Sequence, residues 1–273
     1  MTVSEEQITN NGKSKENTPH KLPIISASSK ALFLKELYQF FSPLAVFSLA
    51  GIWLFWGICF FVFFEQYQAL AAKLAMLENR RGATQMLLVT ANNLLMWLLV
   101  AWVIFFASKT VATEFEQQTF RLLPRHLGGF VRSLKYKFLV ILLSIALLVL
   151  PFWLAVFALS FATDWDLGQV FGIFLTQVLF AVYAASSAIL AALFLRQGVA
   201  SALFLALFWL LLYVLPLIIY EPASLAAVVQ WFSPFSHAQL LSAGIFHIQT
   251  LTFILLNAFF FISLTLLVDW EAR

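Results

Sequence analysis

Charged residues are scarce in this chain of 273 residues: Asp, Glu, Lys and Arg make up 11% of it, whereas hydrophobic residues make up 62%. Soluble domains carry roughly 25% charged residues, so this composition excludes an ordinary soluble protein and indicates an integral membrane protein. The net charge of +3 is too small to favour a nucleic-acid partner. The single cysteine, Cys59, excludes an intramolecular disulfide and a thiolate metal cluster.

Motifs for catalysis and nucleotide binding are also missing. Gly12-Lys13-Ser14 superficially resembles part of a phosphate-binding loop, but Gln7 stands where the first glycine is required and no strand precedes it. All four histidines lie outside the long apolar runs, and His237 and His247, the nearest candidate for a metal site, have no carboxylate between them. Zinc sites normally need three or four ligands. We therefore expect a protein that is not an enzyme and binds no cofactor or metal ion itself.

Six windows of the sequence are long and apolar enough to cross a membrane as helices. A bilayer core of about 30 Å requires about 20 apolar residues in helical form, and none of the six windows contains Asp, Glu, Lys or Arg. The windows are residues 44–64, 87–107, 138–161, 170–195, 199–219 and 250–268. The period-two alternation of a membrane β-barrel is absent. The sequence predicts an all-α fold of six membrane-spanning helices, with residues 1–29 as a disordered polar tail and residues 30–273 as one transmembrane domain.

Lysines and arginines are distributed unevenly between the two sides of this bundle. The side with more of them faces the cytoplasm, by the positive-inside rule. Residues 1–43 contain five, residues 108–137 contain six, and Arg196 and Arg273 lie on the same side, whereas the first loop on the opposite side contains three. We therefore expect a multi-pass plasma-membrane protein with both termini in the cytoplasm.

Small residues recur at helical spacing along the fourth window and at its entrance. They are Gly168, Gly172, Ala181, Ala184, Ala185 and Ala188. Small side chains let two membrane helices approach each other closely. Packing within one chain and contact between two subunits both use such a stripe, and packing within the chain is the favoured interpretation.

A basic segment, residues 112–138, interrupts the apolar chain between the second and third windows. Thr113 and Glu116 have the spacing of a capping box. An apolar stripe typical of a short helix follows at Val111, Phe115, Thr119, Leu122 and Leu123. Such a helix can lie in the headgroups, where arginines attract anionic membrane lipid. It can also dock in a groove of a soluble partner, and Glu114 and Glu116 favour this alternative because carboxylates gain nothing at an anionic surface.

Three stretches of the chain carry a recognisable pattern. The first is the stretch "LKELYQFFSPLAVF", which contains Lys35-Glu36 and precedes the first span. The second is the basic segment, at Glu114, Thr119, Leu122, Leu123, Pro124, Lys137 and Phe138, and the third is "SPFSHAQ" with "LSAGIF" before the last span. In that order they resemble the amphipathic elbow helix, the cytoplasmic loop and the outer segment of the permeases of type-2 ATP-binding cassette exporters, most closely their gliding-motility and nitrous-oxide-reductase maturation branch. Gln118 and Tyr136 stand where the family pattern has glycine.

This resemblance implies a transmembrane subunit of a bacterial inner membrane that pairs with a second permease copy or a paralogue. It also implies two separate ATPase subunits, which would use ATP and Mg²⁺ and would be coupled to the spans by the helix in the basic segment. The implied coupling residues are Glu114, Phe115, Glu116, Thr119, Arg121, Leu122 and Leu123.

The segment between the fifth and sixth windows predicts a helical hairpin at the outer surface. Ser233 suits an N-cap, Pro234 the first helical position and Gly244 a stop, so we expect a helix from Pro234 to about Ala243. The resemblance implies that this hairpin covers the exit path, with His237 and Gln239 near a leaving substrate. The favoured interpretation is that both are interfacial groups that hydrogen-bond headgroups or backbone, since polar tips are common at the interface.

The absence of charged residues from the six windows also limits how transport by this chain could be driven. Ion-coupled transporters place Asp, Glu, His or Arg within the membrane, so the energy for transport by this chain would have to come from outside the spans. An exporter subunit driven by a separate ATPase meets this condition. A membrane scaffold that uses the same cytoplasmic helix without transport, and a passive channel or secondary carrier, stay open as alternatives.

Overall fold

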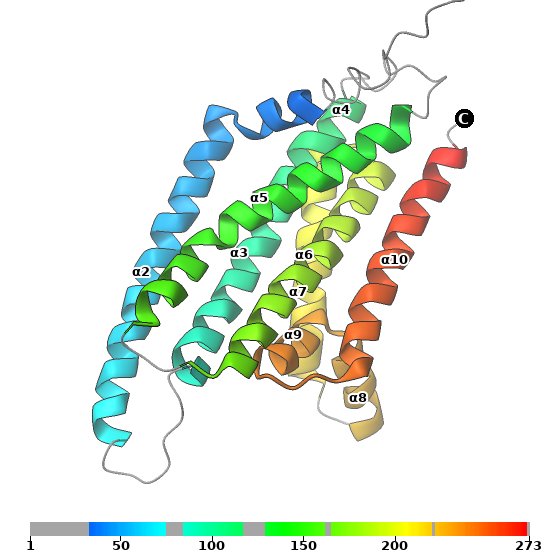
Figure 1. Ribbon diagram of the computed structural model, residues 1–273. Helices are drawn as coiled ribbons and strands as arrows, with labels where there is room; N and C mark the ends of the chain where they lie inside the picture. Colours follow the sequence, from blue (N-terminus) through cyan, green and yellow to red (C-terminus); the bar gives the residue numbers. More distant parts are fainter. Residues whose placement is uncertain (1–32, 75–83, 117–128, 162–164, 220–221, 272–273) are drawn as a thin grey trace, which may run out of the picture.

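The computed structural model describes residues 33–74, 84–116, 129–161, 165–219 and 222–271 (Figure 1). The predicted tail, residues 1–29, lies outside the described residues. Six helices of the described chain are long and apolar enough to cross a membrane, which confirms the predicted number of spans. The chain is therefore a multi-pass membrane protein, and its described residues form an all-helical bundle.

Each of the six helices overlaps one predicted window. The first is α2 (Pro43–Leu74). The second is α3 (Val89–Ala107), which is extended by two short π-helices, η1 (Thr84–Leu88) before it and η2 (Ser108–Ala112) after it. The others are α5 (Gly129–Leu159), α6 (Leu167–Leu195), α7 (Gly198–Ile218) and α10 (Ile248–Glu271).

The third span begins well before its predicted window, because α5 starts at Gly129 rather than near Phe138. Each residue added to an existing helix gains a backbone hydrogen bond, so the helix extends through the basic run that precedes the apolar window. Lys135 and Lys137 consequently lie on a membrane helix. The predicted window contains no charged residue, whereas the helix that includes it does.

The helix α6 lies at the centre of the bundle. Of its most apolar stretch, 72% is buried inside the chain, against 11% for α2. Ala181, Ala184, Ala185 and Ala188 are all buried, and α6 packs against α3, α7, α9 (Pro234–Ser242) and α10. Small side chains let these helices approach. The alanines of the stripe are thus used for packing within the chain.

Gly172 marks a very close approach between α6 and α9. A Cβ atom at this position would lie 2.1 Å from the carbonyl oxygen of Leu241, so the two backbones meet in a space that admits no side chain. Gly168, at the entrance of α6, is exposed instead. Its N–H donates to Asp166 Oδ1 at 2.9 Å, and this aspartate caps the helix.

The two ends of the bundle carry different short helices (Figure 1). The α4 end carries α4 (Thr113–Glu116), the helical residues 33–40 and the last turns of α10. The α9 end carries α8 (Ala223–Phe232) and α9. The first and last described residues therefore lie at the same end of the bundle.

The predicted helix after Ser233 is confirmed. It begins at Pro234, and the Ser233 hydroxyl accepts a hydrogen bond from the N–H of Ser236 at 3.5 Å. It ends at Ser242, and Gly244 follows with φ of 80°, a left-handed conformation that favours glycine. Because α8 packs against α9, the two short helices form the expected hairpin.

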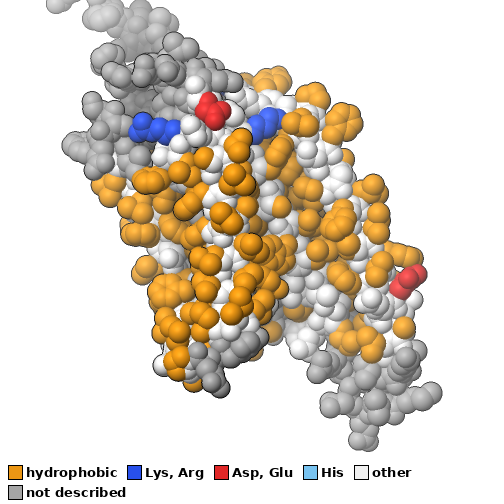
Figure 2. Space-filling view, turned by 180° about the vertical axis from the view of Figure 1, so that it is seen from behind, with side chains coloured by type: hydrophobic (Ala, Val, Ile, Leu, Met, Phe, Trp, Pro, Cys, Tyr) orange, Lys and Arg blue, Asp and Glu red, His pale blue; other side chains and the backbone are white. Residues whose placement is uncertain are grey.

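Hydrophobic side chains cover most of one face of the molecule between its ends, and charged side chains appear near the ends (Figure 2). Large apolar side chains such as Phe47, Leu54, Leu203 and Leu207 are more than half exposed on α2 and α7. Water would oppose such exposure, whereas lipid does not. The outward faces of these helices therefore fit a hydrocarbon environment.

Candidate functional site

Four charged side chains meet at the α4 end and form what we name the ion cluster: Lys35, Glu36, Glu114 and Lys137. The Lys137 Nζ atom donates to Glu36 Oε2 at 2.8 Å and lies 3.0 Å from Glu114 Oε2. The Lys35 Nζ atom donates to the other oxygen of Glu114, Oε1, at 2.9 Å. Two positive and two negative charges thus balance within one contact network.

The four residues come from three separate segments of the chain. Lys35 and Glu36 lie on the helical residues 33–40, Glu114 lies on α4, and Lys137 lies on α5. The π-helix η2 joins α3 to α4, and its i to i+5 bonding changes the rotation of α4 relative to α3. The carbonyl oxygen of Thr110, within η2, accepts a further bond from Lys137 Nζ at 3.1 Å. The ion cluster therefore links the segments before the first, after the second and within the third span.

Burial makes this pairing obligatory. The side chains of Glu36 and Lys137 are 2% exposed, and that of Glu114 is 8% exposed, while Lys35 is 51% exposed. A buried charge that loses its partner costs several kcal/mol, on the order of 3–5. The buried lysine and the two carboxylates consequently hold the three segments in one arrangement.

The pKa values of the two carboxylates in the ion cluster are shifted in opposite directions. Burial raises the pKa of Glu36, and the attraction of Lys137 only partly offsets this. Burial also acts to raise the pKa of Glu114, but attraction by Lys137 and hydrogen bonds from Lys35 and Lys137 outweigh it, so that pKa lies below its ordinary value. The geometry explains the difference, because Glu36 Oε1 has no hydrogen-bond partner among the described residues.

A second contact fastens α4 to the fifth span, α7 (Gly198–Ile218). Glu116 Oε1 accepts a hydrogen bond from the N–H of Gly198, the first residue of α7, at 2.8 Å. The amino-terminal N–H groups of a helix lack intrahelical acceptors and carry partial positive charge, so this carboxylate caps α7. In addition, Lys109 Nζ donates to Ser42 Oγ at 2.8 Å, between η2 and the residue that precedes α2.

Three of the seven predicted coupling residues are described: Glu114, Phe115 and Glu116, which lie on α4. Both carboxylates bind groups of the chain itself, so each already has a role within the fold. The other four, Thr119, Arg121, Leu122 and Leu123, lie outside the described residues. Binding of a partner by this segment stays a prediction.

The predicted capping box at Thr113 and Glu116 is wrong. The helix runs without a break from α3 through η2 into α4, so α4 has no free amino terminus to cap. The Thr113 hydroxyl donates instead to the carbonyl of Lys109 in the preceding turn, and Glu116 caps α7. The spacing was present, but the helix start that it requires was not.

Sequence analysis missed the pairing of Glu36 with Lys137. Lys137 directly precedes the window 138–161, and Glu36 belongs to the stretch "LKELYQFFSPLAVF" that leads into the window 44–64. A signal was available: charges of opposite sign placed before two spans that enter from the same side are in position to pair. Their separation along the chain concealed the contact.

At the α9 end, His237 is a structural residue of the hairpin. Its Nε2 atom lies 2.8 Å from the carbonyl oxygen of Trp231, its Nδ1 atom lies 3.2 Å from Thr250 Oγ1, and its ring stacks on Phe253 with centroids 4.4 Å apart. The ring is 6% exposed. Gln239 is exposed. His237 thus joins α8, α9 and α10, and a role of either side chain at an exit path stays a prediction.

Uncharged polar side chains form a second buried group near α9, which we name the amide cluster: Asn92, Gln177 and Ser242. Asn92 Nδ2 donates to Ser242 Oγ at 3.0 Å, and Gln177 Nε2 donates to Asn92 Oδ1 at 2.9 Å. The indole N–H of Trp153 donates to Gln177 Oε1 at 2.7 Å. All three members are at most 4% exposed. Polar groups buried this deeply in an apolar bundle must satisfy one another.

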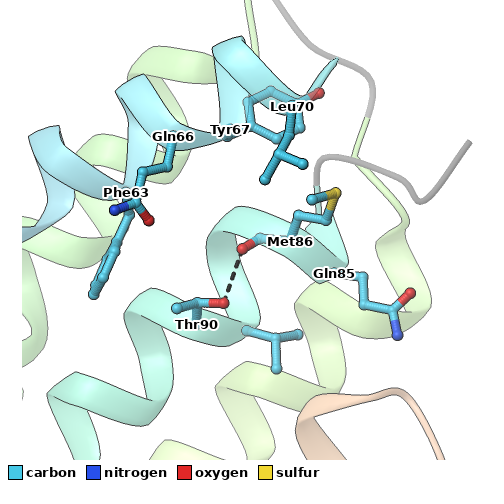
Figure 3. A pocket seen from close by; sticks show the side chains of 8 residues that line it. Phe63, Gln66, Tyr67, Leu70, Gln85, Met86 and Thr90 are labelled. Atoms are coloured by element: carbon cyan, nitrogen blue, oxygen red, sulfur yellow. Dashed lines mark hydrogen bonds between the residues drawn. The ribbon is translucent and has the colours of Figure 1, made fainter. Parts of the chain in front are cut away.

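A surface pocket of about 430 Å³ lies between the last turns of α2 and the start of the second span (Figure 3). Its lining combines rings, amides and aliphatic groups: Phe63, Gln66, Tyr67, Leu70, Gln85, Met86, Val89 and Thr90. The Thr90 hydroxyl donates to the carbonyl of Met86 at 2.8 Å. None of the lining side chains is charged, and none belongs to the ion cluster or the amide cluster.

Comparison with known proteins leaves the family undetermined: no protein-family model matches the chain, and no curated protein matches it significantly. Among the described residues, no group of three or more His, Cys, Asp or Glu side chains could hold a metal ion. What the structure establishes is the class, an all-helical multi-pass membrane protein with a charge-neutral ion cluster at one end and an amide cluster toward the other.

Proposed function

We propose that this chain is the membrane-spanning subunit of an ATP-driven exporter, with ATP hydrolysis in a separate subunit that binds at the α4 end. In this proposal the α4 end faces the cytoplasm, as the distribution of lysines and arginines predicts. The helical residues 33–40 serve as the elbow helix, and α4 begins the coupling segment. The α8–α9 hairpin faces the opposite side and covers the exit path.

The observation that carries this proposal is the convergence of three segments in the ion cluster. The resemblance to type-2 exporter permeases rests on positions that include Lys35-Glu36, Glu114 and Lys137. These residues form one contact network, in which Glu36 and Lys137 pair across 101 positions of the chain. A displacement of α4 would be transmitted to α5 through Glu114 and to α7 through Glu116, and it would reach α3 along the continuous helix. Because a buried ion cluster resists separation, these helices would move together.

The distribution of charge within the spans supports an external energy source. The predicted windows hold no Asp, Glu, Lys or Arg. The candidate spans of the structure extend beyond these windows and add Lys109, Lys135 and Lys137, at the end that carries α4, and Glu65, which is exposed in the second half of α2. A coupling ion that crossed the bundle would need titratable or charged partners along its path. Mechanical coupling to an ATPase requires none.

Purification from the native membrane tests the proposal. A tagged chain is extracted in mild detergent, its associated subunits are identified, and ATP hydrolysis is measured after transfer to nanodiscs. We expect an ATP-binding cassette ATPase to copurify. Glu114→Gln, which removes the charge that Lys35 and Lys137 share, should lower ATPase retention or the hydrolysis that depends on the chain by about tenfold, the effect of losing 1.4 kcal/mol.

Glu65→Gln is the matched control, because Glu65 undergoes the same chemical change on an exposed face of α2. It should leave hydrolysis unchanged. Absence of any nucleotide-hydrolysing subunit, or uphill transport by the purified chain alone, would overturn the proposal. An ATPase that binds without altering any transported species would identify the chain as a scaffold instead.

A further inference from the structure

The second span and its extensions form one uninterrupted rod between the two ends of the bundle. The helices η1, α3, η2 and α4 follow one another from Thr84 to Glu116 without a break. Asn92 lies near one end of this rod and Glu114 near the other. At a rise of 1.5 Å per residue, the two positions are roughly 33 Å apart along the axis. A displacement of Glu114 therefore has a direct covalent and hydrogen-bonded path to Asn92.

The Asn92 side chain connects this rod to the α8–α9 hairpin. Its Nδ2 atom donates to Ser242 Oγ, at the last residue of α9, and its Oδ1 atom accepts from Gln177 of α6. Ser242 Oγ also lies 3.4 Å from Thr176 Oγ1 of α6. Ser242 thus has bonding partners on two helices, and only the bond to Asn92 depends on the position of the rod.

The two attachments of the rod differ in how easily they separate. The ion cluster holds buried charges, which are costly to leave unpaired. A hydrogen bond between neutral groups contributes only about 0.5–1.5 kcal/mol net, and Ser242 can keep its contact with Thr176 when Asn92 moves. A rotation or shift of the rod would therefore break the Asn92–Ser242 bond while the ion cluster stays intact.

We infer that Asn92, Gln177 and Ser242 are positioning residues that hold α9 on α3 and α6, and that the rod transmits movement of the ion cluster to α9 through the Asn92–Ser242 bond. This inference rests on the proposed function only in taking the α4 end as the place where force arrives. In the resting chain the amide cluster fixes the hairpin on α3 and α6. When α4 moves, Asn92 withdraws from Ser242, and α9 loses this attachment to α3 while it keeps its contact with α6.

Hydrogen exchange of α9, measured by mass spectrometry on the full chain alone in nanodiscs, tests the attachment. Ser242→Ala should speed exchange in the peptide covering residues 234–243 about fivefold, as expected for the loss of one neutral hydrogen bond. Ser236→Ala is the matched control, since it is the same change on the same helix outside the amide cluster. Equal exchange in the two variants would show that the amide cluster does not hold α9 in place and would overturn the inference.

A double-mutant cycle tests transmission along the rod. Glu114→Gln alone should change α9 exchange about threefold or more, which corresponds to a neutral hydrogen-bond energy, and should have less than half of that effect in the Ser242→Ala background. Equal effects in both backgrounds, or none in either, would overturn transmission. Lys35→Met, which removes the half-exposed partner of Glu114, provides a second perturbation if Glu114→Gln lowers the yield of folded chain.

These measurements use no ATPase and no substrate, so their outcome is independent of the exporter proposal. Loss of coupling between Glu114 and Ser242 would leave the identification of an ATPase partner untouched. Conversely, failure of any ATPase to copurify would leave a measured coupling between the two ends of the chain in place.

Discussion

At both ends of this bundle short helices are attached to long ones, but the side chains that attach them are charged at one end and neutral at the other. At the α4 end, two lysines and two glutamates join the helical residues 33–40, α4 and α5. At the α9 end, neutral amides, hydroxyls and an imidazole join α8, α9 and α10 to α3 and α6. Charges produce an attachment that is costly to break, and neutral groups produce one that can exchange partners.

The difference should appear first in stability, and Lys137→Met should give the largest effect. Methionine keeps the approximate length of lysine but leaves Glu36 and Glu114 buried without their shared partner. We expect a loss of about 3–5 kcal/mol in the free energy of unfolding, measured by denaturant titration in detergent micelles. Lys35→Met, at a side chain that is 51% exposed, should cost less than about 1 kcal/mol. Similar losses for the two lysines would contradict the distinction between buried and exposed members of the ion cluster.

The close approach of α6 and α9 predicts the next largest effect. In Gly172→Ala the new Cβ would meet the Leu241 carbonyl oxygen at 2.1 Å, and a backbone atom cannot move aside alone. Forcing the helices apart should cost about 1–3 kcal/mol and weaken the amide cluster, which can be followed by thermal unfolding and by exchange in α9. Gly51→Ala is the control, because no atom lies within 4 Å of its Cβ position. An unchanged Gly172→Ala protein would show that the two backbones can separate freely.

Acid should loosen the α9 end before the α4 end. Burial lowers the pKa of His237 below its ordinary value of 6.5, although the bond to the Trp231 carbonyl acts in the opposite direction. The unfolded chain therefore binds the proton more readily, so this stabilisation is complete above pH 6.5 and is lost as the pH falls through the lower folded value. The pKa of Glu114 is lowered as well, but its contribution is present above its ordinary value of 4.5 and disappears only in stronger acid.

Exchange in α9, corrected for the intrinsic effect of pH, should consequently rise as the pH falls below 6.5, the ordinary pKa of histidine. The side chains that bond or stack with the His237 ring, Thr250 and Phe253, carry no charge. His237→Gln should abolish the pH dependence. A rise in this variant equal to that of the native chain would assign the effect to another group.

The smallest effect concerns Glu116, which caps α7. Glu116→Gln keeps an oxygen that can accept from the Gly198 N–H but removes the charge that interacts favourably with the helix dipole. We expect a loss of about 0.5 kcal/mol at low salt that fades as salt is added. Glu65→Gln, on α2, should show no salt-dependent loss. An effect of Glu116→Gln that is independent of salt would argue for the hydrogen bond alone.

Composition and periodicity were sufficient to predict the six spans and the helix after Ser233. Both depend on properties that act over a few neighbouring residues, namely the length of an apolar run and the geometry of a Ser-Pro helix start. The capping box at Thr113 failed for the complementary reason. Its residues were present, but continuation of α3 through η2 removed the free helix end on which that motif depends.

The partners of the polar residues could not be predicted in the same way. The structure pairs Asn92 with Ser242 and Gln177, which are 150 and 85 positions away. The ion pair of Glu36 with Lys137 joins positions 101 apart. No pattern in a single sequence specifies which of several buried polar groups will meet, because that depends on how the helices rotate and tilt against one another.

The sequence by itself determined that the chain crosses a membrane six times, because unsatisfied backbone groups cannot face hydrocarbon and long apolar runs must therefore become helices. Only the tertiary structure decided that α6 lies at the centre and that Glu114 belongs to an ion cluster within the chain. It also decided that His237 and Ser242 hold the hairpin in place. These outcomes depend on which helix faces come together, and backbones approach closely only where small residues such as Gly172 allow it.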